Sequence, residues 1–348
     1  MKLLAGLALA SLAAAAPMVE KRASSGLDVS LQMDGNSKVK AVITNNGNKN
    51  LKVLKSGTFL DSSAVEKAEV YSGNQSVAFD GVRVSIHTDY LTDSAFQAIP
   101  AGESIEVEFD VAEMHDLSIS GTYSILTSGA LSYAEENSTT LIGSVPFSSN
   151  KLEAVIDGAE AYSVRTAFQK RSIVQPDCTG DRLTTITNAL ARSNSLATAA
   201  HQAAQSGADA KMIEYFKSAS ADTRSTVAGV YGRIATETGS TTGGNAKFYC
   251  SDPYGACSDG VLAYTVPGLS YMAYCDLFFT ALPATTSTCH AQEQGTTVLH
   301  ESTHLTQIKG TLDYGGYGYD FLRSLTAEQN INHADTYALF ANAIGLGC

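Results

Sequence analysis

Cysteine is missing from the first half of this 348-residue chain. All six cysteines lie after residue 171, and none forms the close CxxC pair that is typical of structural zinc sites. An even number confined to one segment predicts three disulfide bonds and an oxidising, exported environment. The six are Cys178, Cys250, Cys257, Cys275, Cys289 and Cys348.

Positive charge is also scarce. The chain has 23 Lys and Arg against 35 Asp and Glu, a formal net charge of −12, and residues 172–348 contain nine of the former and fifteen of the latter. This balance argues against a nucleic-acid partner, because phosphate binding relies on Lys and Arg. It favours basic polypeptides, which an acidic surface attracts.

Long apolar runs are absent after the N-terminus. A spanning helix needs about 18 apolar residues, and no later segment reaches that length, so we expect no membrane anchor. Met1-Lys2, the apolar run from Leu3 to Ala16 and its small-residue end are typical of a secretory signal peptide over residues 1–16. The sequence therefore predicts a secreted, extracellular protein.

What the chain does contain is His300-Glu301-Ser-Thr-His304, an HExxH motif. On a helix, residues i and i+4 lie on the same face, so both imidazoles can reach one metal ion. Glu301 can then act as the general base of a metal-dependent hydrolase. The apolar residues before the motif predict an amphipathic helix, whereas an exposed helix turn with two unrelated histidines is the simpler alternative.

A catalytic zinc ion usually takes three protein ligands, and Asp313 is the natural third. The common metzincin continuation would need a glycine and a histidine where the chain has Gln307 and Gly310. A thermolysin-like Asn-Glu pair is missing near position 324. Asp313 follows Gly310, which can turn the chain back to the metal after the helix ends.

The run His300–His304 followed by Gly310-Thr-Leu-Asp313 resembles the deuterolysins, fungal neutral zinc proteases of the aspzincin group. The resemblance implies one zinc ion held by His300, His304 and Asp313, with Glu301 as the catalytic acid and base. It also implies a preference for basic proteins, including lysine after the scissile bond. The predicted enzyme is thus a zinc metalloendopeptidase.

One tyrosine of this family is thought to hydrogen-bond the oxyanion of the reaction. Here the Tyr-Gly pair falls one residue late, with Gly316 in the usual tyrosine position. We predict that Tyr317 has this role, with Tyr314 and Tyr319 as alternatives. The Gly/Tyr run could also be a flexible surface loop.

The resemblance further implies consecutive disulfides, Cys178 to Cys250, Cys257 to Cys275 and Cys289 to Cys348. Ahead of the first cysteine stands Lys170-Arg171, a dibasic pair that predicts cleavage by a kexin-like protease. We therefore predict a propeptide over 17–171 and a catalytic domain over 172–348. Lys21-Arg22 is a candidate for earlier trimming.

The predicted propeptide shows the alternating pattern of half-buried strands over 27–33, 39–44 and 105–111, which favours a β-sandwich. Asn74 and Asn137 begin glycosylation sequons. We expect this segment to assist folding and to block the active-site cleft. A permanent β-module that binds another molecule is the alternative.

The catalytic segment predicts an α+β, mainly helical, zincin-like domain with a small sheet. Helical spacing covers 181–206, 208–237 and 327–343, and short strands are expected at 246–250, 261–266 and 271–275. The sheet edge could hold an extended substrate. In the last helix, Asp335 could orient a zinc-bound histidine or be a solvated charge.

Two other functions compete with this prediction. A zinc hydrolase could act on another kind of amide. A secreted, disulfide-rich binding or surface protein could retain the metal site without catalysis, although the presence of Glu301 argues against that alternative.

Overall fold

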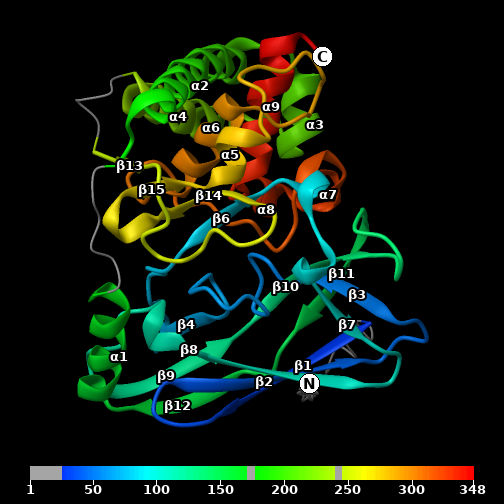
Figure 1. Cartoon of the computed structure of the whole chain (residues 1–348), viewed down its shortest axis with the longest axis vertical. Helices are drawn as coiled ribbons and strands as arrows, with labels where there is room; N and C mark the ends of the chain where they lie inside the picture. The colour runs from blue at the N-terminus through cyan, green and yellow to red at the C-terminus, as the bar shows by residue number, and fades with distance from the viewer. Residues whose placement is uncertain (1–25, 171–176, 240–244) are drawn as a thin grey trace, which may run out of the picture.

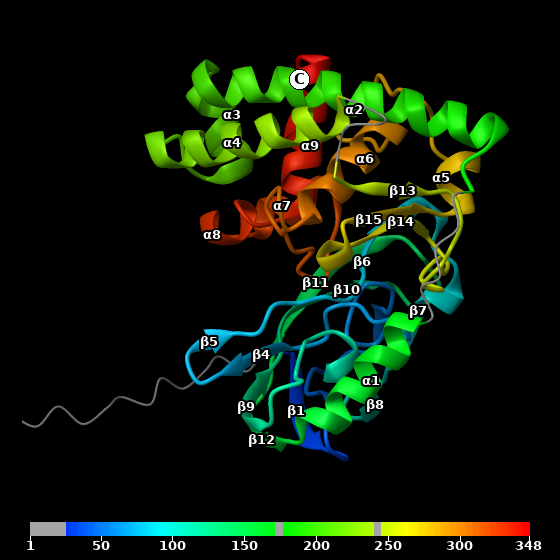
Figure 2. The same ribbon diagram turned by 90° about the vertical axis from the view of Figure 1, so that its left-hand side faces the viewer.

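The computed structural model describes residues 26–170, 177–239 and 245–348, with side chains up to 166 in the first range. The predicted signal peptide 1–16, the pair Lys21-Arg22 and Arg171 lie outside the described residues. Figures 1 and 2 show a strand-rich N-terminal part stacked against a helix-rich C-terminal part. The chain is therefore a mixture of helices and sheets, as the predicted α+β class requires.

One sheet of the N-terminal part follows the predicted alternation closely. Its order is β1 (Leu27–Met33), β2 (Lys38–Asn45) and β8 (Ser104–Asp110), all antiparallel. Alternate residues of β2, including Val39 and Ile43, are buried, as expected for a sheet with one face on a core. The strand predicted to reach 111 ends at Asp110, because the next three residues form a 3-10 turn capped by the Asp110 side chain.

Two further four-stranded sheets complete this part, and the last strand leads into helix α1 (Gly158–Lys170). The first sheet has the order β11 (Leu141–Ser148), β10 (Ser128–Ala134), β3 (Leu51–Leu54) and β7 (Phe96–Ile99). The second has the order β12 (Leu152–Ile156), β9 (Gly121–Leu126), β4 (Glu69–Ser72) and β5 (Gln75–Ser76). Leucine, isoleucine, valine and phenylalanine side chains from all three sheets share one apolar core.

The C-terminal part is built on long helices that enclose the HExxH segment. Helices α2 (Gly180–Ser206) and α4 (Ala221–Thr238) pack along each other, and α6 (Gln294–His304) packs against both α2 and α9 (Ala334–Leu346). A second apolar core fills this part. The shorter helices are α3 (Asp209–Phe216), α5 (Asp276–Thr280), α7 (Gly318–Ser324) and α8 (Ala327–Asn330).

Two predicted helices are each broken in two. The helix expected over 208–237 ends at Phe216, where Lys217 adopts a left-handed conformation, and restarts with Ser220 as the cap of α4. The helix expected over 327–343 is interrupted before α9. There His333 is extended and its ring is buried against the Gly316 carbonyl. Helical periodicity continued across both breaks, so it gave no sign of them.

The small sheet of the C-terminal part contains one strand from the N-terminal part. Its order is β13 (Lys247–Tyr249), β15 (Tyr271–Tyr274), β14 (Val261–Val266) and β6 (Arg83–Ile86). The first three strands match the predicted ones, with small shifts at their ends. β6 pairs antiparallel with β14, so the two parts of the chain share this sheet.

Three disulfides cross-link the C-terminal part, with the pairing that the resemblance implied: Cys178–Cys250, Cys257–Cys275 and Cys289–Cys348. The last one joins the C-terminal residue to the loop before α6. Among the described helices, none combines the length and the apolar character needed to cross a membrane.

Candidate metal centre

Helix α6 carries the HExxH segment and is buried on every side. It begins with a capping box in which Glu293 and Thr296 satisfy each other's backbone N–H groups. The Glu293 carboxylate also pairs with Arg192 of α2, at 2.6 Å. All eleven residues of α6 are buried, so the predicted amphipathic helix is wrong: strands β6 and β14 and helices α2, α4 and α9 surround it.

The three predicted ligand side chains come together at the end of α6. His300 Nε2 and His304 Nε2 are 3.1 Å apart, and Asp313 Oδ1 lies 3.3 Å and 3.5 Å from them. Gly310, in a left-handed conformation with φ of 68°, turns the chain after the helix and brings Asp313 back. All three side chains are buried, and their ligand atoms can hold one metal ion.

The outer nitrogens of both imidazoles are already occupied. His300 Nδ1 donates to Asp335 Oδ1 at 2.8 Å, and His304 Nδ1 donates to the Thr311 carbonyl at 2.9 Å. In the neutral rings these bonds leave an unprotonated Nε2 on each histidine, which is the form that binds a metal. Among the described residues, no donor satisfies the buried Asp313 Oδ1. Two imidazole lone pairs and an orphaned carboxylate oxygen fit a zinc ion.

Glu301 lies in the same pocket without contacting the ligands through hydrogen bonds. Its Oε2 accepts a 2.6 Å hydrogen bond from the Thr265 hydroxyl of β14. Its Oε1 is buried and has no hydrogen-bond partner in the described part of the chain. Burial raises the pKa of Glu301 to about 8, so this carboxyl group can hold a proton near neutral pH. A cation beside it would favour the ionised form and lower that pKa.

The structure separates the three candidate tyrosines. The Tyr317 ring stacks beside His300, with 6.3 Å between the ring centroids. Burial raises the pKa of the Tyr317 hydroxyl well above the usual value, so the hydroxyl keeps its proton and can donate a hydrogen bond. Tyr319 stacks on His290 instead, and its hydroxyl donates to Glu214. Tyr314 packs toward His333. Of the three, Tyr317 is the one whose ring lies against a predicted ligand.

A family model described as the deuterolysin metalloprotease (M35) family matches residues 2–348. The chain belongs to this family. It is therefore a metalloprotease, and the predicted resemblance to the deuterolysins is confirmed.

Deuterolysin-family relatives match along almost the whole chain. A "Neutral protease 2 homolog" of Colletotrichum graminicola is 55% identical over all of both chains. "Neutral protease 2" of Aspergillus oryzae is 40% identical over 98% of this chain and 97% of that protein. A solved zinc peptidase from Grifola frondosa aligns with 48% of this chain and 97% of its own, at 24% identity and a TM-score of 0.41.

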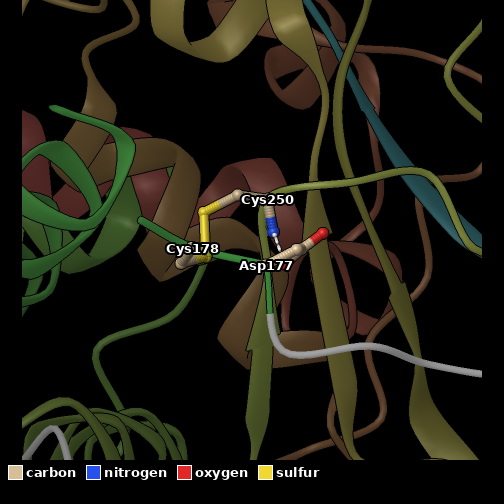
Figure 3. Close-up of side chains that lie close together, drawn as sticks. All are labelled: Asp177, Cys178 and Cys250. Atoms are coloured by element: carbon tan, nitrogen blue, oxygen red, sulfur yellow. Dashed lines mark hydrogen bonds between the residues drawn. A yellow bond between two sulfur atoms is a disulfide. The ribbon is translucent and has the colours of Figure 1, made fainter. Parts of the chain in front are cut away.

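A second group of candidate ligands in this deuterolysin-family chain has another explanation. Asp177, Cys178 and Cys250 lie close together, but the two sulfur atoms are bonded to each other (Figure 3). Asp177 Oδ1 accepts the backbone N–H of Cys250 at 3.0 Å. A disulfide has no thiolate to offer a metal ion, so this group is a cross-link with a carboxylate beside it.

The N-terminal part covers the metal centre. The hydroxyl of Tyr317 donates to the backbone carbonyl of Val84 in β6 at 3.0 Å, a bond between residues 233 positions apart. On the other side, Ser132 of β10 donates to the Gly315 carbonyl. A cavity of about 520 Å³ remains between the two parts, with Asp313 and Tyr314 in its wall.

Three features of the site were missed in the sequence: the Thr265 hydroxyl, the Thr311 carbonyl and strand β6. Thr311 lies inside the Gly-Thr-Leu-Asp motif, so its position next to Asp313 was a usable signal. Thr265 had none, because it reaches Glu301 from 36 residues away. The alternating residues of β6 indicate a strand but not its partner, since pairing is set by the tertiary fold.

Proposed function

We propose that this metalloprotease is an exported zinc endopeptidase that cleaves polypeptides, with basic proteins as preferred substrates, and is made as an inactive preproenzyme. The observation that carries the proposal is one buried pocket that brings together His300 Nε2, His304 Nε2, the Asp313 carboxylate and Glu301 Oε1, which has no hydrogen-bond partner among the described residues. These groups match the requirements of metal-assisted hydrolysis.

In this proposal each residue has a separate role. His300, His304 and Asp313 hold one zinc ion, and Asp335 orients the His300 ring. Bound zinc acts as a Lewis acid and lowers the pKa of a water ligand to about 7. Glu301 Oε1 takes the proton of the attacking water and gives it to the leaving amine, while Thr265 holds Oε2 in place. Tyr317 donates to the developing oxyanion, as oxyanion-hole donors do.

The proposed processing divides the chain into three segments. The signal peptide covers 1–16, a β-sandwich-like propeptide covers 17–171, and a mainly helical, zincin-like catalytic domain covers 172–348. A kexin-like protease would cut after Lys170-Arg171. The disulfides support export, and both sequon residues, Asn74 and Asn137, are exposed where glycans could be attached.

Substrate preference and binding mode are supported by charge and by sheet topology. The proposed catalytic domain has a net charge of −6, from nine basic and fifteen acidic residues, which would attract basic proteins. Once the propeptide leaves, β14 becomes a sheet edge beside Glu301. An extended substrate can add to that edge as a strand.

The test uses the zinc-loaded full-length protein after cleavage at Arg171 and dilution that lets the cleaved propeptide dissociate. We expect casein cleavage that is lost with a chelator, restored by zinc, and reduced by a factor of about 10³ or more in Glu301→Gln. Glu328→Gln, which changes another glutamate away from the metal centre, is the matched control and should retain activity. A folded, zinc-loaded protein that leaves casein and lysine-rich polypeptides intact at every dilution would overturn the proposal in favour of a binding protein.

A further inference from the structure

Strand β6 lies in the sheet position that a substrate would need. It pairs antiparallel with β14, in the register Arg83 to Thr265, Val84 to Tyr264 and Ser85 to Ala263. The strand also contacts α6 itself. Beyond β6, the backbone N–H of His87 donates to the Gly260 carbonyl, and Gln292 donates its amide to the Ile86 carbonyl. The catalytic part therefore holds this segment largely through its backbone, as sheet edges hold peptides.

The Val84 carbonyl is the backbone group that meets the catalytic residues. Its oxygen accepts the 3.0 Å hydrogen bond from Tyr317, the proposed oxyanion donor. A peptide carbonyl bound to this donor, on a strand next to Glu301, has the surroundings of a scissile carbonyl. The following peptide bond leads to Ser85.

Ser85 faces α6. Opposed residues of an antiparallel pair share a face of the sheet, and so do alternate residues of one strand. Ser85 therefore lies on the same face as Thr265, whose hydroxyl contacts Glu301. The Ser85 side chain is fully buried, and among the described residues nothing bonds its hydroxyl.

Neighbouring residues of the N-terminal part hold β6 in this position. Arg83 forms a 2.6 Å ion pair with Glu66, and its guanidinium lies over the Phe79 ring. The turn at Gly57, with φ of 73°, passes so closely that an added Cβ would lie 2.9 Å from Val84 Cγ2 and 3.0 Å from the Tyr317 hydroxyl. Contacts with the rest of the N-terminal part thus fix both Arg83 and Val84 of the strand.

We infer that β6 is the inhibitory segment of the propeptide, and that it blocks the cleft by binding as a substrate strand does, with the Val84 carbonyl in place of the scissile carbonyl. This inference rests on the proposed function and adds the site and mode of inhibition. No thiolate is involved, since the N-terminal part has no cysteine.

A consequence is that cleavage at Arg171 does not by itself open the active site. The contacts of β6 are non-covalent and lie more than 80 residues before that bond. Helix α1 ends at Lys170, and an ion pair between Arg165 of this helix and Asp80 holds it against the segment just before β6. The cleaved propeptide therefore remains a bound inhibitor until it dissociates.

The experiment measures how tightly the cleaved propeptide stays bound. Zinc-loaded wild type, Ser85→Phe and the control Ser104→Phe are cleaved at Arg171, and casein cleavage is followed on dilution. Ser104 is exposed on β8, so a larger side chain there has room. Ser85 is fully buried against α6, and a phenylalanine at this position would be too large for the space between β6 and α6. We expect Ser85→Phe to weaken propeptide binding about tenfold or more, and Ser104→Phe to leave it unchanged.

Hydrogen exchange of β14 amides supplies a readout that does not need catalysis. The amides of Val261–Val266 that face β6 should be protected in wild type and in the control, and exposed sooner in Ser85→Phe. Glu66→Gln, which removes the partner of Arg83, should shift both readouts in the same direction by a smaller factor. It replaces Ser85→Phe if circular dichroism shows that variant to be unfolded.

Equal affinity and equal β14 protection in all the folded variants would overturn the inhibitory role of β6. Failure of the proposed function gives another pattern: no casein cleavage at any dilution, while β14 exchange still reports whether β6 is bound.

Discussion

The two parts of the chain are held together by different means, and the buried cluster of candidate metal ligands lies in only one of them. The N-terminal part has no cysteine, and its apolar core is spread over three sheets and continues into β14 and β15 of the other part. The C-terminal part has three disulfides and buries a cluster of ionisable side chains around His300 and Glu301. Buried polar groups cost stability unless they are paired, and cross-links offset such a cost by restricting the unfolded chain. In the proposed preproenzyme, only the cross-linked part has to persist outside the cell after processing.

The largest effect should follow removal of the Cys289–Cys348 disulfide, which spans 59 positions. A loop of this length predicts a loss of about 4 kcal/mol in the free energy of unfolding, from greater freedom of the unfolded chain. Denaturant unfolding of the Cys289→Ser/Cys348→Ser variant measures it. Under reducing conditions the N-terminal part should keep its hydrogen-exchange protection, and a parallel loss in both parts would contradict the contrast between them.

A core substitution should affect the N-terminal part instead. Ile43 of β2 is fully buried, and Ile43→Ala leaves a cavity that should lower the free energy of unfolding of this part by about 3 kcal/mol. Hydrogen exchange resolved by segment would show the loss in β1, β2 and β8. Val155→Ala, at an exposed position of β12, is the matched control and should have little effect. An equal loss at both positions would argue against an apolar core as the source of stability.

Asp335 should matter through metal binding rather than through the fold alone. Its two oxygens accept hydrogen bonds from His300 Nδ1 and from the Gly318 backbone N–H, at 2.8 Å and 2.7 Å. We expect Asp335→Ala to weaken zinc binding by about 10–100-fold, as the loss of such orienting partners does. Competition with a chromophoric chelator measures the affinity. Asp320→Ala, on α7, is the control, and unchanged zinc affinity in Asp335→Ala would refute the orienting role.

The smallest effect should be the pH dependence that His115 gives to the N-terminal part. His115 is buried between the carbonyls of Ala68 and Val77, and desolvation lowers the pKa of its imidazole below 6.5. The unfolded chain therefore binds the proton more readily than the folded one. The stability contributed by neutral His115 is present above pH 6.5 and decreases as the pH falls below it.

Unfolding measured between pH 7.5 and 5 should show a shallower slope for His115→Gln than for wild type. His201→Gln, in α2, should leave the slope of the N-terminal part unchanged. Identical slopes in all three proteins would show that His115 does not set this dependence.

Local patterns predicted much of each part. The alternation over 27–33 and 39–44 located β1 and β2, because one face of a sheet must be apolar. Helical periodicity located α2 but missed the breaks before α4 and α9, where a left-handed residue and a buried histidine interrupt the helix. In the site, His300, His304 and Asp313 were found together because they lie within 14 residues of one another.

What the sequence alone determined is thus the family, the cysteine-rich half and the residues that can surround one metal ion, since helix period and a single turn bring those together. Only the tertiary structure decided that Asp335 reaches His300, that Thr265 holds Glu301, and that β6 lies on β14 with its carbonyl at Tyr317. These contacts join residues 35 to 233 positions apart. Which residues meet in these contacts depends on how the two cores pack, and a local sequence pattern carries no information about that packing.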